Sequence, residues 1–323
     1  MSKKIVVVRN VEDKKTMPIV EEAAAKYGYS VEFYKNLQEA LPHLEDAEIV
    51  HGLSQKLIDS APNAKWFCIA SAGVNGYDPD SLDKRGILVS NSSGTYGITI
   101  AEHIIMMTTM IMRHMFDFEE HRKNHTWFSH KNLTSDFRTI CGSNILVLGT
   151  GNLGATFAER VRSFEPASII GVSRSGKPVP AFDKVVSLDG LDEELPKADV
   201  VVMCLPGTPE TEGIMNKKRI ALLSKDAILI NVGRGTAIDD EALIDALEND
   251  RIAAAALDVF RAEPLAEDSP LWSTKNLYIT PHISGQDTAE ITREINMRMF
   301  AEDIENYCEG RPLKYAVDLR RGY

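Results

Sequence analysis

The sequence predicts an α/β protein made of two doubly wound parallel-sheet domains. Short apolar runs, typical of buried strands, alternate with helical stretches along most of the chain. This alternation implies parallel strands joined by crossover helices. The chain has 323 residues, which is too long for one small hydrophobic core and suits two domains.

The first hundred residues contain one such series. The expected strands are residues 5–8, 30–34, 49–51, 65–70 and 87–90, with a helix at residues 17–26. A long helix follows from about residue 99 to 118. Because it carries apolar residues all round, we expect it to be buried between the two domains.

A second series begins at Asn144. Its expected strands are residues 145–148, 168–172, 200–204, 227–232, 253–257 and 277–280. Helices are expected at residues 152–163 and 239–248, the second capped by Asp239 or Asp240. A last helix, about residues 288–308, leads to a tail too short to form a domain.

We therefore expect the end of the chain to return to the first domain, which becomes discontinuous. Residues 1–100 and 285–323 are assigned to a substrate-binding domain. Residues 101–284 are assigned to a nucleotide-binding domain. Both are expected to be Rossmann-like or flavodoxin-like.

The most specific motif is Gly149-Thr150-Gly151-Asn152-Leu153-Gly154, directly behind the apolar run 144–148. In a strand–turn–helix context, these glycines form a loop that binds a dinucleotide pyrophosphate. Gly149 permits the turn, Gly151 lets phosphates approach the backbone, and Gly154 lets helix and strand pack closely. The N-terminus of the helix adds free N–H groups for the anion.

The end of the next strand indicates which dinucleotide is bound. NAD-selective sites place Asp or Glu about 20 residues after the glycines. Here the strand leads into Ser173 and Arg174, with Lys177 close by and no carboxylate before Asp183. A hydroxyl and cationic groups would hold a 2′-phosphate that a carboxylate would repel. The sequence thus predicts NADP(H) in preference to NAD(H).

Composition and charge exclude several other classes. The chain has 36 basic and 47 acidic residues, a net charge of −11, which disfavours nucleic acid and anionic membranes as partners. Its four cysteines are far apart and form no CxxC motif. Neither a signal-peptide pattern nor a membrane-length apolar run is present, so a cytoplasmic protein is expected.

Three residues suggest chemistry: Arg234, Glu263 and His282. Each follows the carboxyl end of an expected strand, where open α/β sheets bind ligands. Alone, each has an ordinary structural interpretation: a surface arginine, a carboxylate at a helix start, and a core histidine. Together with the dinucleotide loop, they favour a catalytic group.

Over nearly its whole length, the chain resembles the D-isomer-specific 2-hydroxyacid dehydrogenases, and in particular their NADP-linked members of broad specificity. The resemblance is carried by Ser71-Ala72-Gly73-Val74-Asn75, Ala101-Glu102-His103, the dinucleotide loop, Gly233-Arg234-Gly235, Leu257-Asp258-Val259-Phe260 with Glu263-Pro264-Leu265, and Thr280-Pro281-His282. Each motif alone is moderately specific, and their order and spacing together are highly specific.

The resemblance implies NADPH-dependent, reversible reduction of small 2-keto acids to D-2-hydroxy acids. Arg234 would hold the carboxylate and carbonyl of the substrate through its planar guanidinium. His282 would exchange a proton with the carbonyl oxygen as hydride is transferred. Glu263 would orient the imidazole and favour its protonated form.

Other site residues also come from the resemblance. Backbone N–H groups of Ala72 and Gly73 would bind the substrate carboxylate, and Tyr96 is a candidate for lining the substrate pocket. The expected cofactor-binding residues are Gly149, Gly151, Asn152, Leu153, Gly154, Ser173, Arg174, Leu205, Pro206, Thr211, Val232 and Asp258. No metal is required. A homodimer is implied, with the histidine-rich segment His103–His130 as a candidate contact.

Other interpretations stay open. A dinucleotide-sensing corepressor of the same fold would keep the same Arg, Glu and His, although it would be expected to prefer NAD(H) and to carry disordered tails. A formate dehydrogenase is disfavoured because that group has Gln in place of Glu263. A phosphoglycerate dehydrogenase is possible, although the chain shows no added regulatory domain, and an inactive scaffold is disfavoured by the intact triad.

Overall fold

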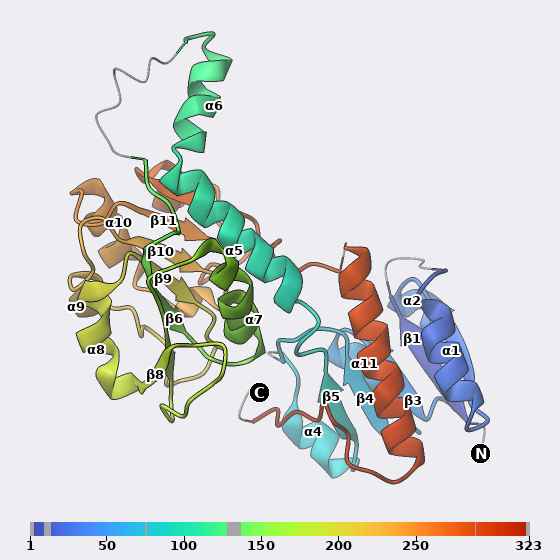
Figure 1. Cartoon of the computed structure of the whole chain (residues 1–323). Coiled ribbons are helices and arrows are strands. Elements are labelled where there is room, and N and C mark those ends of the chain that lie inside the picture. Colours follow the sequence, from blue (N-terminus) through green and yellow to red (C-terminus); the bar gives the residue numbers. More distant parts are fainter. Residues whose placement is uncertain (1–2, 10–13, 75, 128–136, 288, 321–323) are drawn as a thin grey trace. The chain divides into compact units, whose positions relative to one another are not determined.

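The computed structural model describes residues 3–9, 14–74, 76–127, 137–287 and 289–320 (Figure 1). The chain divides into two compact units. Unit 1 comprises Met1–Tyr96 and Gln286–Tyr323, and unit 2 comprises Gly97–Gly285. The second unit therefore begins at Gly97, slightly earlier than the sequence suggests, and the end of the chain does return to the first unit.

Unit 1 contains a five-stranded sheet whose named strands are all parallel, in the order β2-β1-β3-β4-β5. This is the flavodoxin-like order. The strands confirm the five predicted runs: β1 Lys4–Val8, β2 Ser30–Tyr34, β3 Ile49–Gly52, β4 Trp66–Ile69 and β5 Leu88–Asn91.

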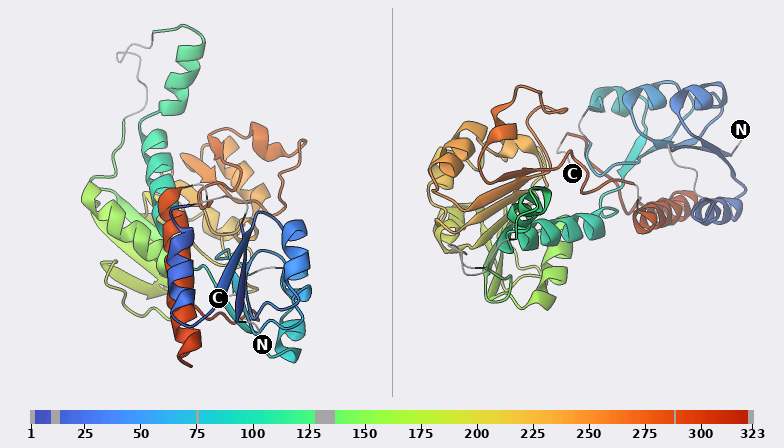
Figure 2. Two further views of the ribbon diagram at one scale, coloured as in Figure 1. Left: turned by 90° about the vertical axis from the view of Figure 1, so that its right-hand side faces the viewer. Right: turned by 90° about the horizontal axis from the view of Figure 1, so that it is seen from above.

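Helices cover both faces of this sheet, because alternate strand residues point to opposite sides. On one face Ile5, Ile49 and Trp66 pack with residues of α1 (Met17–Ala25) and α11 (Glu290–Cys308). The opposite face packs on three short helices: α2 Leu37–Ala40, α3 Gln55–Asp59 and α4 Pro79–Lys84. The right-hand view of Figure 2 shows α1 and α11 side by side, with unit 1's sheet between them and the short helices.

The C-terminal tail extends this sheet, a feature that the sequence did not predict. Asn91 N–H donates to Tyr315 O (3.1 Å), and Val317 N–H donates to Val89 O (3.1 Å). An isolated antiparallel bridge joins Ser90 to Ala316. The buried carboxylate of Asp303 on α11 accepts the N–H groups of residues 314 and 315 (2.6 and 3.2 Å) and so holds the tail in place.

Replacing Asp303 with Ala should therefore destabilise unit 1. The N–H groups of Lys314 and Tyr315 would lose their buried acceptor, which costs about 1–3 kcal/mol of unfolding free energy. The neighbouring Glu302 also contacts the tail, through Lys314 and Tyr315, but its side chain is 44% exposed. Glu302→Ala should cost less than about 1 kcal/mol. Urea unfolding of both variants checks this, and equal losses would contradict it.

Unit 2 contains a seven-stranded parallel sheet in the order β12-β11-β10-β9-β6-β7-β8. Six strands confirm predicted runs, and the order within the unit is Rossmann-like, with one further strand at the β12 edge. The half-exposed edge strand β8 was not predicted. The bounds are β6 Asn144–Leu148, β7 Ser168–Ser173, β8 Lys184–Ser187, β9 Val200–Met203, β10 Ile228–Asn231, β11 Ala254–Leu257 and β12 Leu277–Ile279.

The helices of unit 2 are mostly where the sequence places them. The α10 helix is capped by Asp239, whose side chain accepts the N–H of Ala242, rather than by Asp240. Helix α5 packs beside α7. The bounds are α5 Gly97–Met112, α7 Asn152–Val161, α8 Leu191–Glu194, α9 Lys217–Ile220 and α10 Asp240–Glu248.

The prediction of a single, fully buried helix at residues 99–118 is wrong in two respects. The chain breaks at His114, which adopts a left-handed φ of 56°, so that α5 is followed by a separate helix α6 (Met115–Lys123). Only one face of α5 is buried, and Met106 is 43% exposed. The part of the histidine-rich segment beyond Trp127 lies outside the described residues. Among the described helices, none has the length and apolarity needed to cross a membrane.

Candidate active site

The predicted site residues of unit 2 gather at one edge of its sheet. Strands β12, β11, β10, β9 and β6 are neighbours and run parallel, so their carboxyl ends meet along that edge. Gly149 follows β6, Arg234 follows β10, Asp258 follows β11 and His282 follows β12. This is the edge at which open α/β sheets bind ligands.

The dinucleotide loop has the geometry that the glycines predict. Gly149 adopts φ +103°, and a Cβ there would lie 2.7 Å from Cys204 O. A Cβ on Gly154 would lie 1.9 Å from Gly149 O, so that only glycine allows the close packing. Gly151 is the N-cap of α7 and makes no side-chain cap, and among the described residues no atom beyond its two chain neighbours lies within 4 Å of where its Cβ would be. The open backbone at this helix N-terminus fits a bound pyrophosphate.

The end of β7 offers cationic and hydroxyl groups. Ser173 ends the strand, with its Oγ accepting the N–H of Gly176, and Arg174 is exposed beside it. The carboxylate of Asp183 instead accepts the N–H of Ile169 (2.7 Å), at the opposite end of β7. Glu210 is the carboxylate whose charge interacts with Arg174, and its pKa is lowered chiefly by a hydrogen bond from Thr208.

Other expected cofactor residues lie in the loops after β9 and β10. Leu205 and Val232 are buried, and Pro206 is exposed. The Thr211 hydroxyl donates to Pro206 O (2.6 Å), so it shapes its own loop.

Arg234 is held by its backbone neighbours. The amide of the fully buried Asn231 donates to Arg234 O (2.9 Å) and accepts the N–H of Gly233 (3.0 Å). The guanidinium donates to Gly233 O (2.7 Å). Burial lowers the pKa of Arg234, and the nearby Glu263 carboxylate raises it. Sequence reasoning missed Asn231, although an Asn at a strand end before Gly-Arg-Gly could have indicated it.

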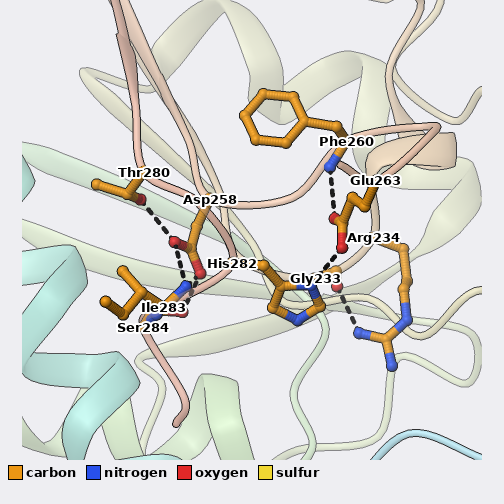
Figure 3. A network of polar contacts seen from close by, with 9 residues as sticks. All are labelled: Gly233, Arg234, Asp258, Phe260, Glu263, Thr280, His282, Ile283 and Ser284. Carbon is orange, nitrogen blue, oxygen red and sulfur yellow. Dashed lines mark hydrogen bonds and ion pairs between the residues drawn. The ribbon is translucent and has the colours of Figure 1, made fainter. Parts of the chain in front are cut away.

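Glu263 and His282 form a close pair (Figure 3). The His282 Nδ1 lies 2.6 Å from Glu263 Oε2, and Glu263 Oε1 accepts the N–H of Phe260 (2.9 Å). The carboxylate is therefore held by the backbone and faces the ring. Because the carboxylate accepts, the Nδ1 atom carries the hydrogen of this bond. The His282 side chain is 49% exposed, which leaves it accessible to a ligand.

Asp258 holds the loop that carries His282. Its buried carboxylate accepts four hydrogen bonds, which come from Thr280 Oγ1 (2.6 Å), Ile283 N (3.0 Å), Ser284 N (3.0 Å) and Ser284 Oγ (2.5 Å). His282 lies inside this clamp in a left-handed conformation, φ 51°. The sequence pointed to Asp258 only as a cofactor residue, because nothing in the spacing shows which N–H groups it receives.

The remaining site residues belong to unit 1. Ala72 and Gly73 lie in the loop after β4, at the carboxyl edge of that sheet. Among the described residues, none accepts a hydrogen bond from the N–H of Ser71, Ala72, Gly73 or Val74. A run of unpaired backbone N–H groups is a feature that binds anions. The Tyr96 hydroxyl donates to Ala70 O (2.9 Å) in the same loop, and Asn75 lies outside the described residues.

Comparisons with known proteins show the family to which the chain belongs. Residues 105–284 match the model of the D-isomer specific 2-hydroxyacid dehydrogenase NAD-binding domain. A D-3-phosphoglycerate dehydrogenase of Archaeoglobus fulgidus is 31% identical over 312 residues, 94% of this chain but 58% of that protein. The chain thus spans little more than half of that relative.

Solved structures are similar over the whole chain. A D-isomer specific 2-hydroxyacid dehydrogenase family protein from Aeromonas salmonicida has a TM-score of 0.83 and 30% identity, covering 98% of this chain and 100% of that one. An NADPH-dependent glyoxylate/hydroxypyruvate reductase from Sinorhizobium meliloti, in complex with NADP and sulfate, has a TM-score of 0.78 and 25% identity, covering 100% of both. The chain belongs to the D-isomer specific 2-hydroxyacid dehydrogenases, which are NAD(P)-dependent oxidoreductases.

The clamp formed by Asp258 gives a prediction for turnover. In Asp258→Asn, an amide group would face hydrogen-bond donors, and the loop around His282 would shift. A displacement of catalytic groups by about 1 Å lowers rates by up to roughly 100-fold, so we expect kcat to fall by about 10- to 100-fold. Asp268→Asn, which alters an exposed carboxylate of the same unit, is the control. Steady-state kinetics measure both, and an unchanged kcat in Asp258→Asn would argue against the clamp.

Proposed function

We propose that the protein catalyses NADPH-dependent reduction of small 2-keto acids to D-2-hydroxy acids. One observation carries the proposal: the Glu263–His282 pair lies at the sheet edge that also bears the dinucleotide loop and Arg234. A proton-exchanging histidine, a carboxylate that supports it and a cation are the groups that carbonyl reduction needs. The relative named as a glyoxylate/hydroxypyruvate reductase supports this substrate class.

The ring of His282 has a defined orientation for proton transfer. Its Nδ1–H is directed at Glu263, so Nε2 is the atom that exchanges a proton with the substrate oxygen. The imidazolium is the form that donates a proton in the reduction direction, and neutral imidazole accepts it in the reverse reaction. When bound, the dinucleotide supplies the hydride.

Two groups recognise the 2-keto acid in this proposal. Arg234 binds the carbonyl side, where its partial burial strengthens the attraction for a negative oxygen. The unpaired N–H groups of Ala72 and Gly73 bind the carboxylate, because backbone donors suit a planar anion.

The preference for NADPH rests on the end of β7. Arg174 and Ser173 would contact the 2′-phosphate. The first carboxylate after them, Asp183, is engaged at the far end of the strand and would not repel that phosphate. The relative from Sinorhizobium meliloti, named as NADPH-dependent, also supports this preference.

Replacing His282 with Ala should remove keto-acid reduction but leave dinucleotide binding. Loss of a general acid lowers kcat by about 100- to 10,000-fold. The Kd for NADPH, measured by fluorescence titration, should change by less than about threefold, since His282 is assigned no contact with the phosphates. His125→Ala, an exposed histidine on the same unit, is the matched control. Near-normal turnover in His282→Ala would rule out His282 as the proton donor.

Replacing Ser173 with Asp and Arg174 with Ile should shift the preference toward NADH. The change removes a charge-assisted contact and adds a carboxylate that repels a 2′-phosphate, so the NADPH/NADH ratio of kcat/KM should fall at least about tenfold. Arg251→Ile is the control, because Arg251 precedes β11 at the opposite edge of the sheet. An unchanged ratio in the double variant would overturn the cofactor assignment.

A further inference from the structure

The loop after β4 has an unusual hydrogen-bond pattern: five consecutive carbonyl groups, from Ile69 to Gly73, each accept a hydrogen bond. The donors are Ser92 Oγ to Ile69 O (2.9 Å), Tyr96 OH to Ala70 O (2.9 Å), Ser92 N to Ser71 O (3.1 Å), Asn91 Nδ2 to Ala72 O (2.8 Å) and Ser71 Oγ to Gly73 O (2.8 Å). Four of these five donors belong to residues 91–96.

The N–H groups of the same loop behave oppositely. From Ser71 to Val74, no N–H group donates to any residue that the structure describes. Each carbonyl already has a donor, whereas the N–H groups have no acceptor among the described residues, so the loop chiefly offers donors to a ligand. An anion is the ligand that such a loop accepts.

Peptide geometry links the two halves of this pattern. In a trans peptide the C=O of one residue and the N–H of the next lie in one plane and point in opposite directions. A hydrogen bond that holds Ala72 O therefore also sets the direction of the Gly73 N–H. In the same way, the bond to Ser71 O directs the N–H of Ala72, and the bond to Ala70 O directs that of Ser71.

We propose that Asn91 is a positioning residue for substrate binding: by holding Ala72 O, its side chain aims the Gly73 N–H at the substrate carboxylate. Tyr96 plays the same part for the Ser71 N–H through Ala70 O. Neither side chain touches the substrate in this role. The inference rests on the proposed function, and it gives Tyr96 a purpose different from lining a pocket.

Asn91 is itself firmly held. It is 6% exposed, its N–H donates to Tyr315 O, and its Oδ1 accepts the N–H of Ser93 (3.1 Å). Asn91 thus contacts the C-terminal tail through its backbone N–H, and it connects the loop after β5 to the loop after β4 through its side-chain amide. A movement of Asn91 would require several hydrogen bonds to break together.

The side chain of the neighbouring Ser92 is held by hydrogen bonds that lead to buried residues of the core. Asn296 Nδ2 donates to Ser92 Oγ (2.7 Å), and Asn296 Oδ1 lies 3.1 Å from His51 Nε2. Burial lowers the pKa of His51 to about 3, so the ring is neutral and this bond places its hydrogen on Nε2. The direction of each donor is then determined from His51 to Asn296, Ser92 and Ile69 O.

The test uses Asn91→Leu, which removes the amide at similar volume, and Tyr96→Phe, which removes only a hydroxyl. The substrates are pyruvate and methyl pyruvate with NADPH, and oxamate is a non-reacting carboxylate probe. Each variant should raise the KM for pyruvate and the Ki for oxamate about tenfold, with a smaller change in kcat. The kcat/KM ratio of acid to ester should fall, because only the acid offers a carboxylate to the loop.

Tyr307→Phe is the matched control for the loss of a hydroxyl. Tyr307 OH donates to the Glu48 side chain (2.9 Å). Glu48 directly precedes β3, so this bond lies at the amino ends of the strands, whereas the loop after β4 lies at their carboxyl ends. This variant should keep the acid-to-ester ratio of the wild type. A purely structural role for Asn91 would lower kcat through loss of folded protein and leave KM, Ki and the ratio unchanged. That result in both variants would overturn the proposal.

The two proposals fail in different ways. If the wild type binds oxamate but reduces no 2-keto acid, the proposed reaction is wrong, and Kd values for oxamate from direct titration still decide the role of Asn91. If the wild type reduces pyruvate and the variants keep its KM and acid-to-ester ratio, the reaction stands and the positioning role is wrong. If the wild type neither binds oxamate nor reduces a 2-keto acid, both proposals are wrong.

Discussion

The chemistry of unit 2 depends on one buried carboxylate, that of Asp258. Four donors from residues 280–284 converge on its two oxygens, and His282 lies between them. A left-handed conformation at a residue other than glycine is unfavourable by roughly 1–2 kcal/mol, and it persists only where surrounding contacts impose it. Here the contacts are short and shielded from water, which makes them strong. The ring then meets Glu263, whose own position is set by the N–H of Phe260.

In the proposed function, each unit recognises negative charge by a different means. In unit 2, a guanidinium held by its own backbone supplies a full positive charge. Unit 1 uses peptide N–H groups, and its recognition therefore depends on backbone direction rather than on a charged side chain. Side-chain charge tolerates some rotation, whereas a peptide dipole must be aimed. On this proposal, the hydrogen bonds to the carbonyl groups of residues 69–73 serve to fix the direction of the neighbouring N–H groups.

Much of the fold could be predicted because buried parallel strands are short apolar runs with clear boundaries. Of the twelve strands that the structure describes, eleven were predicted from this pattern alone, whereas the twelfth, β8, is a half-exposed edge strand whose pattern is weak. The break at His114 was missed because the apolar pattern continues across it, and a left-handed residue leaves no periodic signal. The tail on β5 was missed because its pairing is made by backbone groups, which every residue has.

The residues of the candidate site also divide into those that the sequence could indicate and those that it could not. Arg234, Glu263 and His282 could be found because rare residue types follow predicted strands, and strand order then brings them to one edge. Asn231 and Asn91 could not be assigned roles, because an Asn near a turn usually serves only the local backbone. Their partners, Arg234 O and Ala72 O, are carbonyl oxygens that sequence patterns do not distinguish.

Because unit 1 is formed by two separate segments of the chain, it cannot be completed until the second segment has been synthesised. Helix α11 lies at the end of the sequence, yet Met297, Phe300 and Ile304 complete the core under β1 and β3. During synthesis, α1 can cover part of this face early, but the part that α11 covers stays exposed until that helix has left the ribosome. Unit 2, whose residues are contiguous, is thus the first unit whose residues are all available to fold, in contrast to the usual N-terminal-first order. Meanwhile the sheet of unit 1 keeps apolar surface exposed, and exposed apolar surface on an incomplete domain favours aggregation.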